Sequence, residues 1–158
     1  MKRVCGAMVL ALMLTACGGR KMYDTYVHTP ETGWEKNDTL SFCVPRATES
    51  TPCEVLLGLR TTESYPFTSV SLIVEQYLCP TPDGSETDTQ VLIDTLSCTL
   101  TGPDGSMTGS GVSYHQYSFP VRTINIHSGD SLTVRVRHDM KREILPGISD
   151  LGIEIVRH

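Results

Sequence analysis

The sequence predicts an all-β domain, an antiparallel two-sheet β-sandwich of about eight strands with a jelly-roll or immunoglobulin-like topology. Three observations lead to this prediction. Apolar and polar residues alternate at every second position along most of the chain, which is the period of half-buried strands. Clusters of Pro, Asp, Gly and Ser separate these segments at short intervals, and helical periodicity is almost absent. A closed barrel is the structural alternative that the pattern leaves open.

The strands are expected where one face of the alternation is apolar. In chain order, these apolar faces are Leu40, Phe42 and Val44; Val55, Leu57 and Leu59; Val70, Leu72 and Val74; Leu96, Cys98 and Leu100; Ile124 and Ile126; Leu132, Val134 and Val136; and Leu151, Ile153 and Ile155. Each face can be buried against a second sheet while the alternate residues stay in solvent.

Turn residues fall between these segments at Pro82-Asp83-Gly84, Pro103-Asp104-Gly105 and Ser128-Gly129-Asp130. Such triplets favour tight turns, because Gly adopts positive φ without steric cost and Asp bonds to its own backbone. The one segment that could be helical runs from Asp139 to Ile144, and Pro146-Gly147 limits it to a single turn.

The first residues have the pattern of a lipoprotein signal. Lys2 and Arg3 form a basic start, and the apolar run that follows ends in Leu14-Thr15-Ala16-Cys17. The run is too short to cross a bilayer as a helix, which takes about 20 residues. The resemblance to the bacterial lipoprotein signal implies cleavage before Cys17 and lipid on that cysteine. We therefore expect a signal peptide at 1–16, a lipidated cysteine with a short tether at 17–22, and a β-sandwich domain at 23–158.

This anchor indicates the compartment. Two or three acyl chains hold a protein firmly, whereas one holds it only marginally. Gly18 stands where an aspartate retains lipoproteins at the inner membrane of well-studied Gram-negative bacteria, so the outer membrane is favoured. The residues after Cys17 also lack the acidic run of a surface-export signal. A periplasm-facing position is the first expectation, and the cell surface is the second.

The charge of the mature chain excludes one class of partner. Cleavage leaves 142 residues (158 − 16) with a net charge of −7 (11 − 18), because both Lys2 and Arg3 are lost. An acidic domain without a basic stripe does not fit nucleic acid, nor electrostatic binding to anionic lipid. The expected partners are the membrane, through the lipid on Cys17, and other envelope proteins.

Four cysteines remain in the mature chain besides Cys17: Cys43, Cys53, Cys79 and Cys98. An even number in an exported protein favours disulfides, with three connectivities. We prefer Cys43–Cys53 and Cys79–Cys98, because each pair would link strands that are adjacent in sequence. Four reduced thiols are the alternative if the periplasm oxidises poorly. Metal binding fits less well, because there is no CxxC spacing and no histidine nearby.

The sequence contains no nucleophile elbow, zinc-protease motif, phosphate-binding loop or dinucleotide fingerprint. We therefore expect no catalytic residue, no metal site and no small-molecule cofactor. His138 continues a strand and is interpreted as a strand cap. Trp34 is a candidate surface anchor for a partner, although a plug at the end of the sandwich is the preferred interpretation. Tyr114, His115 and Tyr117 could contact sugar or protein, but an edge strand with a half-exposed aromatic face is preferred.

Several short sequence motifs follow the lipoprotein signal in a particular order. They are Gly33-Trp34 with Asp38-Thr39-Leu40-Ser41-Phe42; Leu57-Gly58-Leu59-Arg60 with Tyr65-Pro66-Phe67; Pro103-Asp104-Gly105 with Gly109 and Gly111; and Gly147 to Ile153. Together they resemble the GldH-type gliding-motility lipoproteins of Bacteroidetes, from Tyr23 to about Arg157. The resemblance implies a membrane-anchored, non-enzymatic component required for gliding, and it carries no catalytic residue.

Two functions follow as expectations. The first is a lipoprotein scaffold that docks onto other envelope proteins. The alternative is a cell-surface carbohydrate-binding lipoprotein, because β-sandwiches commonly hold such sites.

Overall fold

The computed structural model describes residues 20–80 and 89–158. The expected signal peptide, Cys17 and the turn predicted at Pro82-Asp83-Gly84 lie outside the described residues. The first strand begins at Lys21, two residues before the expected start of the sandwich at Tyr23. The strands are β1 (Lys21–His28), β2 (Trp34–Glu35), β3 (Leu40–Val44), β4 (Thr51–Thr61), β5 (Ser69–Cys79), β6 (Gln90–Thr99), β7 (His115–Ile126), β8 (Ser131–His138), β9 (Ile144–Leu145) and β10 (Ile148–Arg157).

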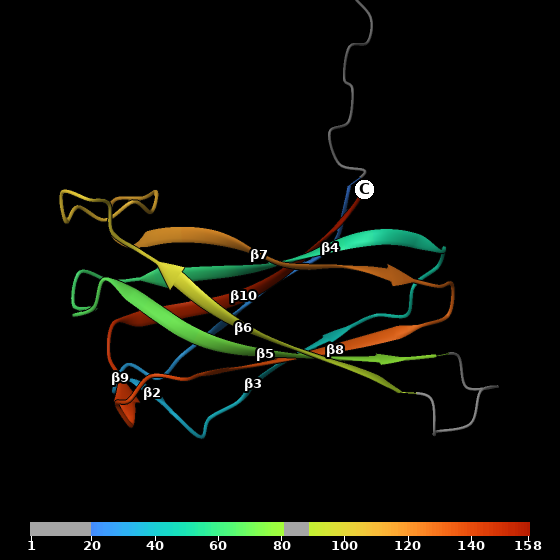
Figure 1. The fold of residues 1–158 in the computed structure, drawn as a ribbon, viewed down its shortest axis with the longest axis horizontal. Coiled ribbons are helices and arrows are strands. Elements are labelled where there is room, and N and C mark those ends of the chain that lie inside the picture. The colour runs from blue at the N-terminus through green and yellow to red at the C-terminus, as the bar shows by residue number, and fades with distance from the viewer. Residues whose placement is uncertain (1–19, 81–88) are drawn as a thin grey trace, which may run out of the picture.

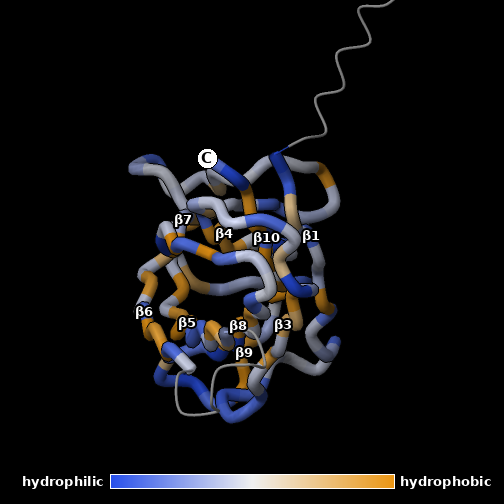
Figure 2. Tube along the Cα trace, turned by 90° about the vertical axis from the view of Figure 1, so that its right-hand side faces the viewer, coloured by the Kyte–Doolittle hydropathy of each residue, from blue (hydrophilic) through white to orange (hydrophobic). Residues whose placement is uncertain are grey.

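Eight of these strands form two antiparallel four-stranded sheets, which confirms the predicted sandwich. Sheet A has the order β1-β10-β4-β7, and sheet C has the order β3-β8-β5-β6. Figure 1 shows the two sheets as layers, and Figure 2 shows them nearly end on, with the labels of sheet A above those of sheet C. The short strands β2 and β9 pair separately. No helix in the part of the chain that the structure describes could span a membrane.

The order of pairing identifies the topology as a jelly roll. The first long strand pairs with the last, and each following strand pairs with one nearer the middle of the chain: β1 with β10, β3 with β8, β4 with β7, and β5 with β6. The chain thus forms one long hairpin that is rolled so that neighbouring pairs fall in opposite sheets. This arrangement decides between the two topologies left open by the sequence.

The core lies between the two sheets and contains the predicted apolar faces. Val55, Leu57 and Leu59 of β4 are fully buried, as are Val70, Leu72 and Val74 of β5. Burying a side chain of this size stabilises the fold by about 1.5–3 kcal/mol relative to leaving it exposed. Figure 2 shows the hydrophobic residues along the strands and mostly hydrophilic turns at the periphery.

The predicted turns are present where the structure describes them. The Gly105 N–H donates to the Gly102 carbonyl (3.0 Å), and the Asp130 N–H donates to the His127 carbonyl (3.0 Å). Gly105 and Gly129 both have positive φ. The helical turn expected from Asp139 to Ile144 is wrong. This segment is a bend, and Ile144 enters β9, because backbone pairing with β2 replaces the local hydrogen bonds of a helix.

The sandwich has two ends. The entry end carries Lys21, Thr51, Ile126 and Arg157, and the far end carries the opposite ends of the same strands. At the far end, the β2–β9 ribbon lies against the core through the buried side chains of Trp34 and Leu145.

Candidate docking sites

The first candidate site is a cluster of four residues on the outer face of sheet A, which we call the Arg60 cluster: Tyr26, Arg60, Tyr114 and Gln116. The guanidinium carbon of Arg60 lies 4.0 Å from the ring centroid of Tyr26 and 5.2 Å from that of Tyr114. The Arg60 Nε donates to Gln116 Oε1 (3.1 Å). The guanidinium is thereby held in one orientation by two rings and an amide.

Two glycines allow this arrangement. Gly58 and Gly152 are opposite each other in neighbouring strands of sheet A. A Cβ on either residue would lie 2.7 Å from ring atoms of Tyr26, so only glycine leaves room for the ring on the outer face. Partial burial raises the pKa of Tyr26, and the nearby Arg60 opposes that shift. The phenol therefore stays neutral beside the cation.

The structure separates the predicted patch of Tyr114, His115 and Tyr117. The Tyr114 side chain is 40% exposed and joins the Arg60 cluster. Tyr117 is buried, and its hydroxyl donates to the Leu100 carbonyl (3.1 Å). His115 is half-buried at the start of β7, which is an edge strand. Tyr114 lies in the bend before β7 and Tyr117 is buried within it, so the two rings do not share one face of this edge strand.

Trp34 is fully buried at the far end, which excludes the surface-anchor interpretation and agrees with the plug. Its indole N–H donates to the Asp38 carbonyl (2.9 Å), and its ring meets that of His138 edge to face at 5.2 Å. His138 is also fully buried. The Met140 N–H donates to His138 Nδ1 (3.4 Å), so His138 Nε2 carries the proton and donates to the Trp34 carbonyl (3.1 Å).

The predicted disulfides are wrong in the structure, where Cys43, Cys53, Cys79 and Cys98 are free thiols. Cys43 is exposed on β3 of sheet C, whereas Cys53 is buried on β4 of sheet A. Cys98 is opposite Val70, at the other end of β5 from Cys79, which separates the two by about 30 Å at 3.3 Å per residue. A disulfide needs Cα atoms within about 7 Å. Adjacency in sequence misled the prediction in two ways. The neighbouring strands β3 and β4 lie in different sheets, and in the β5–β6 hairpin the antiparallel register places Cys79 and Cys98 at opposite ends.

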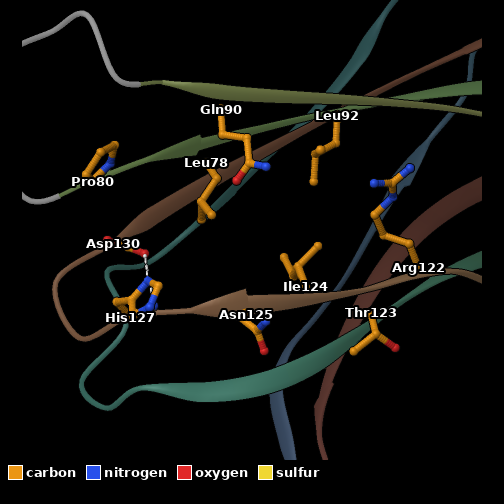
Figure 3. Close-up of a pocket in the computed structure, with 10 residues that line it drawn as sticks. All are labelled: Leu78, Pro80, Gln90, Leu92, Arg122, Thr123, Ile124, Asn125, His127 and Asp130. Carbon is orange, nitrogen blue, oxygen red and sulfur yellow. Dashed lines mark hydrogen bonds and ion pairs between the residues drawn. The ribbon is translucent and has the colours of Figure 1, made fainter.

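A second candidate site is the open cleft between the sheets, along β6 and β7. The cleft has a volume of about 500 Å³. Figure 3 shows Leu78, Leu92 and Ile124 pointing into it from different strands. Arg122 lies along one side of the cleft and forms two hydrogen bonds to Asp94 (2.7 and 2.8 Å). The cleft is therefore lined by apolar side chains and by one ion pair, in which the charges of Arg122 and Asp94 offset each other.

Gln76 extends this polar pair into the core. Its side chain is fully buried, and Nε2 donates to Asp94 Oδ2 (2.9 Å). Gln76 Oε1 has no hydrogen-bond partner among the residues that the structure describes. The sequence did not identify Gln76, Asp94, Arg122 or Arg60 as site residues. The alternation of apolar and polar residues does not show whether a polar side chain bonds to another side chain or to water.

Within residues 20–80 and 89–158, no group of three or more His, Cys, Asp or Glu side chains is close enough to hold a metal ion. Most of the sequence motifs on which the family resemblance rests lie in loops at the far end of the sandwich. The segments around Gly33, Tyr65, Gly105 and Gly147 all connect strands there. Gly147 has a φ of +80°, and a Cβ on it would overlap the backbone of Tyr65.

Comparison with solved structures gives weak likenesses. An aminopeptidase from the marine sediment archaeon Thaumarchaeota archaeon matches with a TM-score of 0.39 and 12% identity, covering 76% of this chain and 24% of that one. A Cocksfoot mottle virus structure matches with a TM-score of 0.30 and 15% identity, covering 99% and 95%. This chain thus spans about a quarter of the aminopeptidase. Both scores are too low to support an argument about fold or function.

Comparison with known sequences is more informative. The chain is 24% identical over 155 residues to the gliding motility lipoprotein GldH of Flavobacterium johnsoniae, covering 94% of this chain and 92% of the relative. The family model for the GldH lipoprotein matches residues 21–155, which is nearly all of the described domain. The chain therefore belongs to the GldH lipoprotein family.

Proposed function

We propose that this chain is a non-enzymatic docking component of the gliding-motility machinery, held in the outer membrane by lipid on Cys17 and facing the periplasm. Family membership supports a motility-associated lipoprotein. The observation that carries the docking role is the Arg60 cluster. Tyr and Arg are the residue types that, with Trp, dominate the energetic centres of protein interfaces.

The geometry of Arg60 suits recognition of an acidic group. Its guanidinium lies near two tyrosine rings, and its Nε donates a hydrogen bond to Gln116. Among the residues that the structure describes, no hydrogen bond uses the two terminal nitrogens of Arg60. A carboxylate can accept hydrogen bonds from two guanidinium N–H groups in parallel, which gives both energy and orientation. The ordering of Arg60 before binding lowers the entropic cost of association.

The anchor limits where the partner can be. Four residue steps separate Cys17 from the start of β1 at Lys21, which corresponds to about 14 Å of extended chain. The domain is thus kept close to the membrane, and its partners belong to the membrane or its immediate surroundings. Gly18 after Cys17 favours the outer membrane, as argued from the sequence.

A matched pair of variants tests the docking role. Arg135 on the outer face of sheet C stacks on Tyr77 with its guanidinium carbon 5.0 Å from the ring centroid, so Arg135→Ala removes a similar contact from the other sheet. Affinity isolation after mild crosslinking of membranes should recover the same envelope proteins with the wild type and with Arg135→Ala. Arg60→Ala should reduce their recovery at least about fivefold, the effect of 1 kcal/mol. Equal recovery from all three chains, or no envelope protein from any, contradicts the proposal.

The alternative function, binding of carbohydrate at the cell surface, draws support from the same exposed ring of Tyr114. Protease treatment of intact cells separates the two. A chain that is degraded only after the outer membrane is opened cannot bind extracellular glycans, whereas degradation on intact cells contradicts the periplasmic position.

A further inference from the structure

The four edge strands of the two sheets differ in how they are protected. An exposed edge invites pairing with another chain, and proteins block it with short strands, bulges, proline or charge. β3 has five residues, β1 has a register shift next to Lys21, and β7 contains Pro120 beside another register shift. β6 has no register shift and no proline, and its one charge, on Asp94, is offset by Arg122. It is ten residues long and pairs with β5 without interruption.

The composition of β6 also favours pairing. It contains no Pro, Gly, Lys or Arg, and its single charged residue is Asp94. That carboxylate points inward and is neutralised by Arg122, so it does not repel an approaching strand. The outer face exposes two β-branched apolar side chains, Val91 (46% exposed) and Ile93 (60% exposed). Such residues are enriched in paired strands and depleted on free surfaces.

The cleft between the sheets opens along the same edge. Leu92 lies on β6 between Val91 and Ile93 and points into the cleft toward Ile124 of β7 (Figure 3). A strand added beside β6 would alternate its side chains between the cleft and the outer face. Half of them would cover Leu78, Leu92 and Ile124, and the other half would cover Val91 and Ile93.

We propose that the outer edge of β6 accepts an extended strand of a partner protein, which continues sheet C and fills the cleft with its inward side chains. The proposal builds on the docking role proposed above and adds to it a second contact surface, at the edge of sheet C. The partner strand is neutral, because the charged groups of the cleft already have partners. Arg122 is paired with Asp94, and Asp130 accepts a hydrogen bond from the His127 backbone N–H. It is rich in β-branched apolar residues on both faces. Backbone pairing supplies affinity, and the alternate side chains supply specificity.

A second copy of this chain fits the edge less well. The inward side chains of its own β6 already line its own cleft, so pairing of two copies would bring two clefts together and fill neither. Apolar surface that is enclosed without being filled loses packing contacts. A single strand with uncommitted side chains avoids this cost.

The test uses the purified mature chain without lipid and a designed peptide. The peptide is a soluble nine-residue strand of Val, Ile and Thr between terminal lysines, and the control is the same peptide N-methylated at alternate residues. Amide hydrogen exchange is measured along the whole chain. The unmodified peptide at about 1 mM should slow exchange in the segment Gln90–Asp94 at least about tenfold. The N-methylated peptide should leave it unchanged, because it cannot complete the ladder.

Matched variants locate the contact. Ile93→Lys should abolish the protection, whereas Ile144→Lys should keep it, because Ile144 (48% exposed) lies on β9 at the far end. Protection of β1, β3 or β7 instead, or protection that survives N-methylation, overturns the proposal. So does the absence of any protection, since backbone pairing tolerates many sequences. Self-association of the free chain that Ile93→Lys abolishes would overturn it in favour of a second copy.

This experiment and the recovery experiment with Arg60→Ala fail independently. Loss of β6 protection with intact Arg60-dependent recovery would remove the strand partner and leave the docking role. Intact β6 protection without any envelope partner would remove the docking role alone.

Discussion

The ring of Tyr26 occupies the space that a side chain on Gly58 would fill. This relationship links the packing of sheet A to the Arg60 cluster, since the same ring lies 4.0 Å from the guanidinium carbon of Arg60. A glycine within a central strand weakens the strand intrinsically. Here an aromatic ring from the edge strand β1, on the other side of β10, covers the exposed backbone.

The contact predicts a non-additive effect of two substitutions. Gly58→Ala forces the Tyr26 ring off the sheet and should destabilise the fold by about 1–3 kcal/mol, as for overpacking. In a Tyr26→Ala background the same change should cost less than about 0.5 kcal/mol, because the clash is gone. Denaturant unfolding of the four chains measures this cycle. Equal costs in both backgrounds would show that the ring does not occupy this position.

The buried plug predicts a spectroscopic signal. Trp34 is the only tryptophan of the chain and is fully buried, so its emission should be blue-shifted in the native state and shift to longer wavelength on unfolding. Trp34→Ala should destabilise the domain by about 3–5 kcal/mol. A native emission spectrum like that of free tryptophan would contradict the plug.

The burial of His138 predicts a dependence of stability on pH. Burial lowers the pKa of His138 below its ordinary 6.5, so below that pH the unfolded chain binds a proton that the native chain does not. Stability should therefore fall as pH decreases through 6.5, by at most about 1.4 kcal/mol per pH unit. Unfolding curves between pH 7.5 and pH 5 measure the slope.

The control for this prediction is a second histidine. His138→Gln should flatten the slope, whereas His158→Gln at the exposed C-terminus should leave it unchanged. An identical slope in His138→Gln would show that another group causes the dependence.

The free thiols predict an order of chemical modification. Cys43 is exposed and should react first with an alkylating reagent at neutral pH. Cys98 is buried, and burial raises its pKa to about 12, so almost no thiolate is available to react. Cys53, whose pKa burial also raises, should be protected in the same way. Mass spectrometry should find Cys53 and Cys98 unmodified in the native chain. Both should be modified once the chain is unfolded, even when no reductant is added, because both are free thiols. A native disulfide at either residue would contradict the structure.

The sequence predicts the sandwich because alternation is a local property. Each apolar face, such as Val55, Leu57 and Leu59, needs only one packed sheet opposite it. The pairing of strands depends on contacts far apart in the chain. The local sequence does not show that Cys98 lies opposite Val70, and the disulfide prediction was wrong for this reason.

The residues of the candidate site could be predicted only in part, for the same reason. Tyr114 could be singled out as an aromatic residue in a polar stretch. Arg60 and Tyr26 could not, since their contact depends on β1 and β4 lying on either side of β10. The local sequence from Asp139 to Ile144 is compatible with a helical turn. In the structure Ile144 pairs with Glu35 of β2 instead, and this contact between distant segments could not be predicted locally.

The most direct test of the docking role is photo-crosslinking in cells of the organism that produces the chain. A photoreactive amino acid is placed at Tyr114 in the Arg60 cluster, and, as a control, at Cys43 on the outer face of sheet C. Discrete crosslinks to envelope proteins are expected from position 114 and weak or absent ones from position 43, and the former should be lost when Arg60→Ala is added. Crosslinks of equal strength from both positions, or crosslinks from 114 that persist without Arg60, would contradict the docking role.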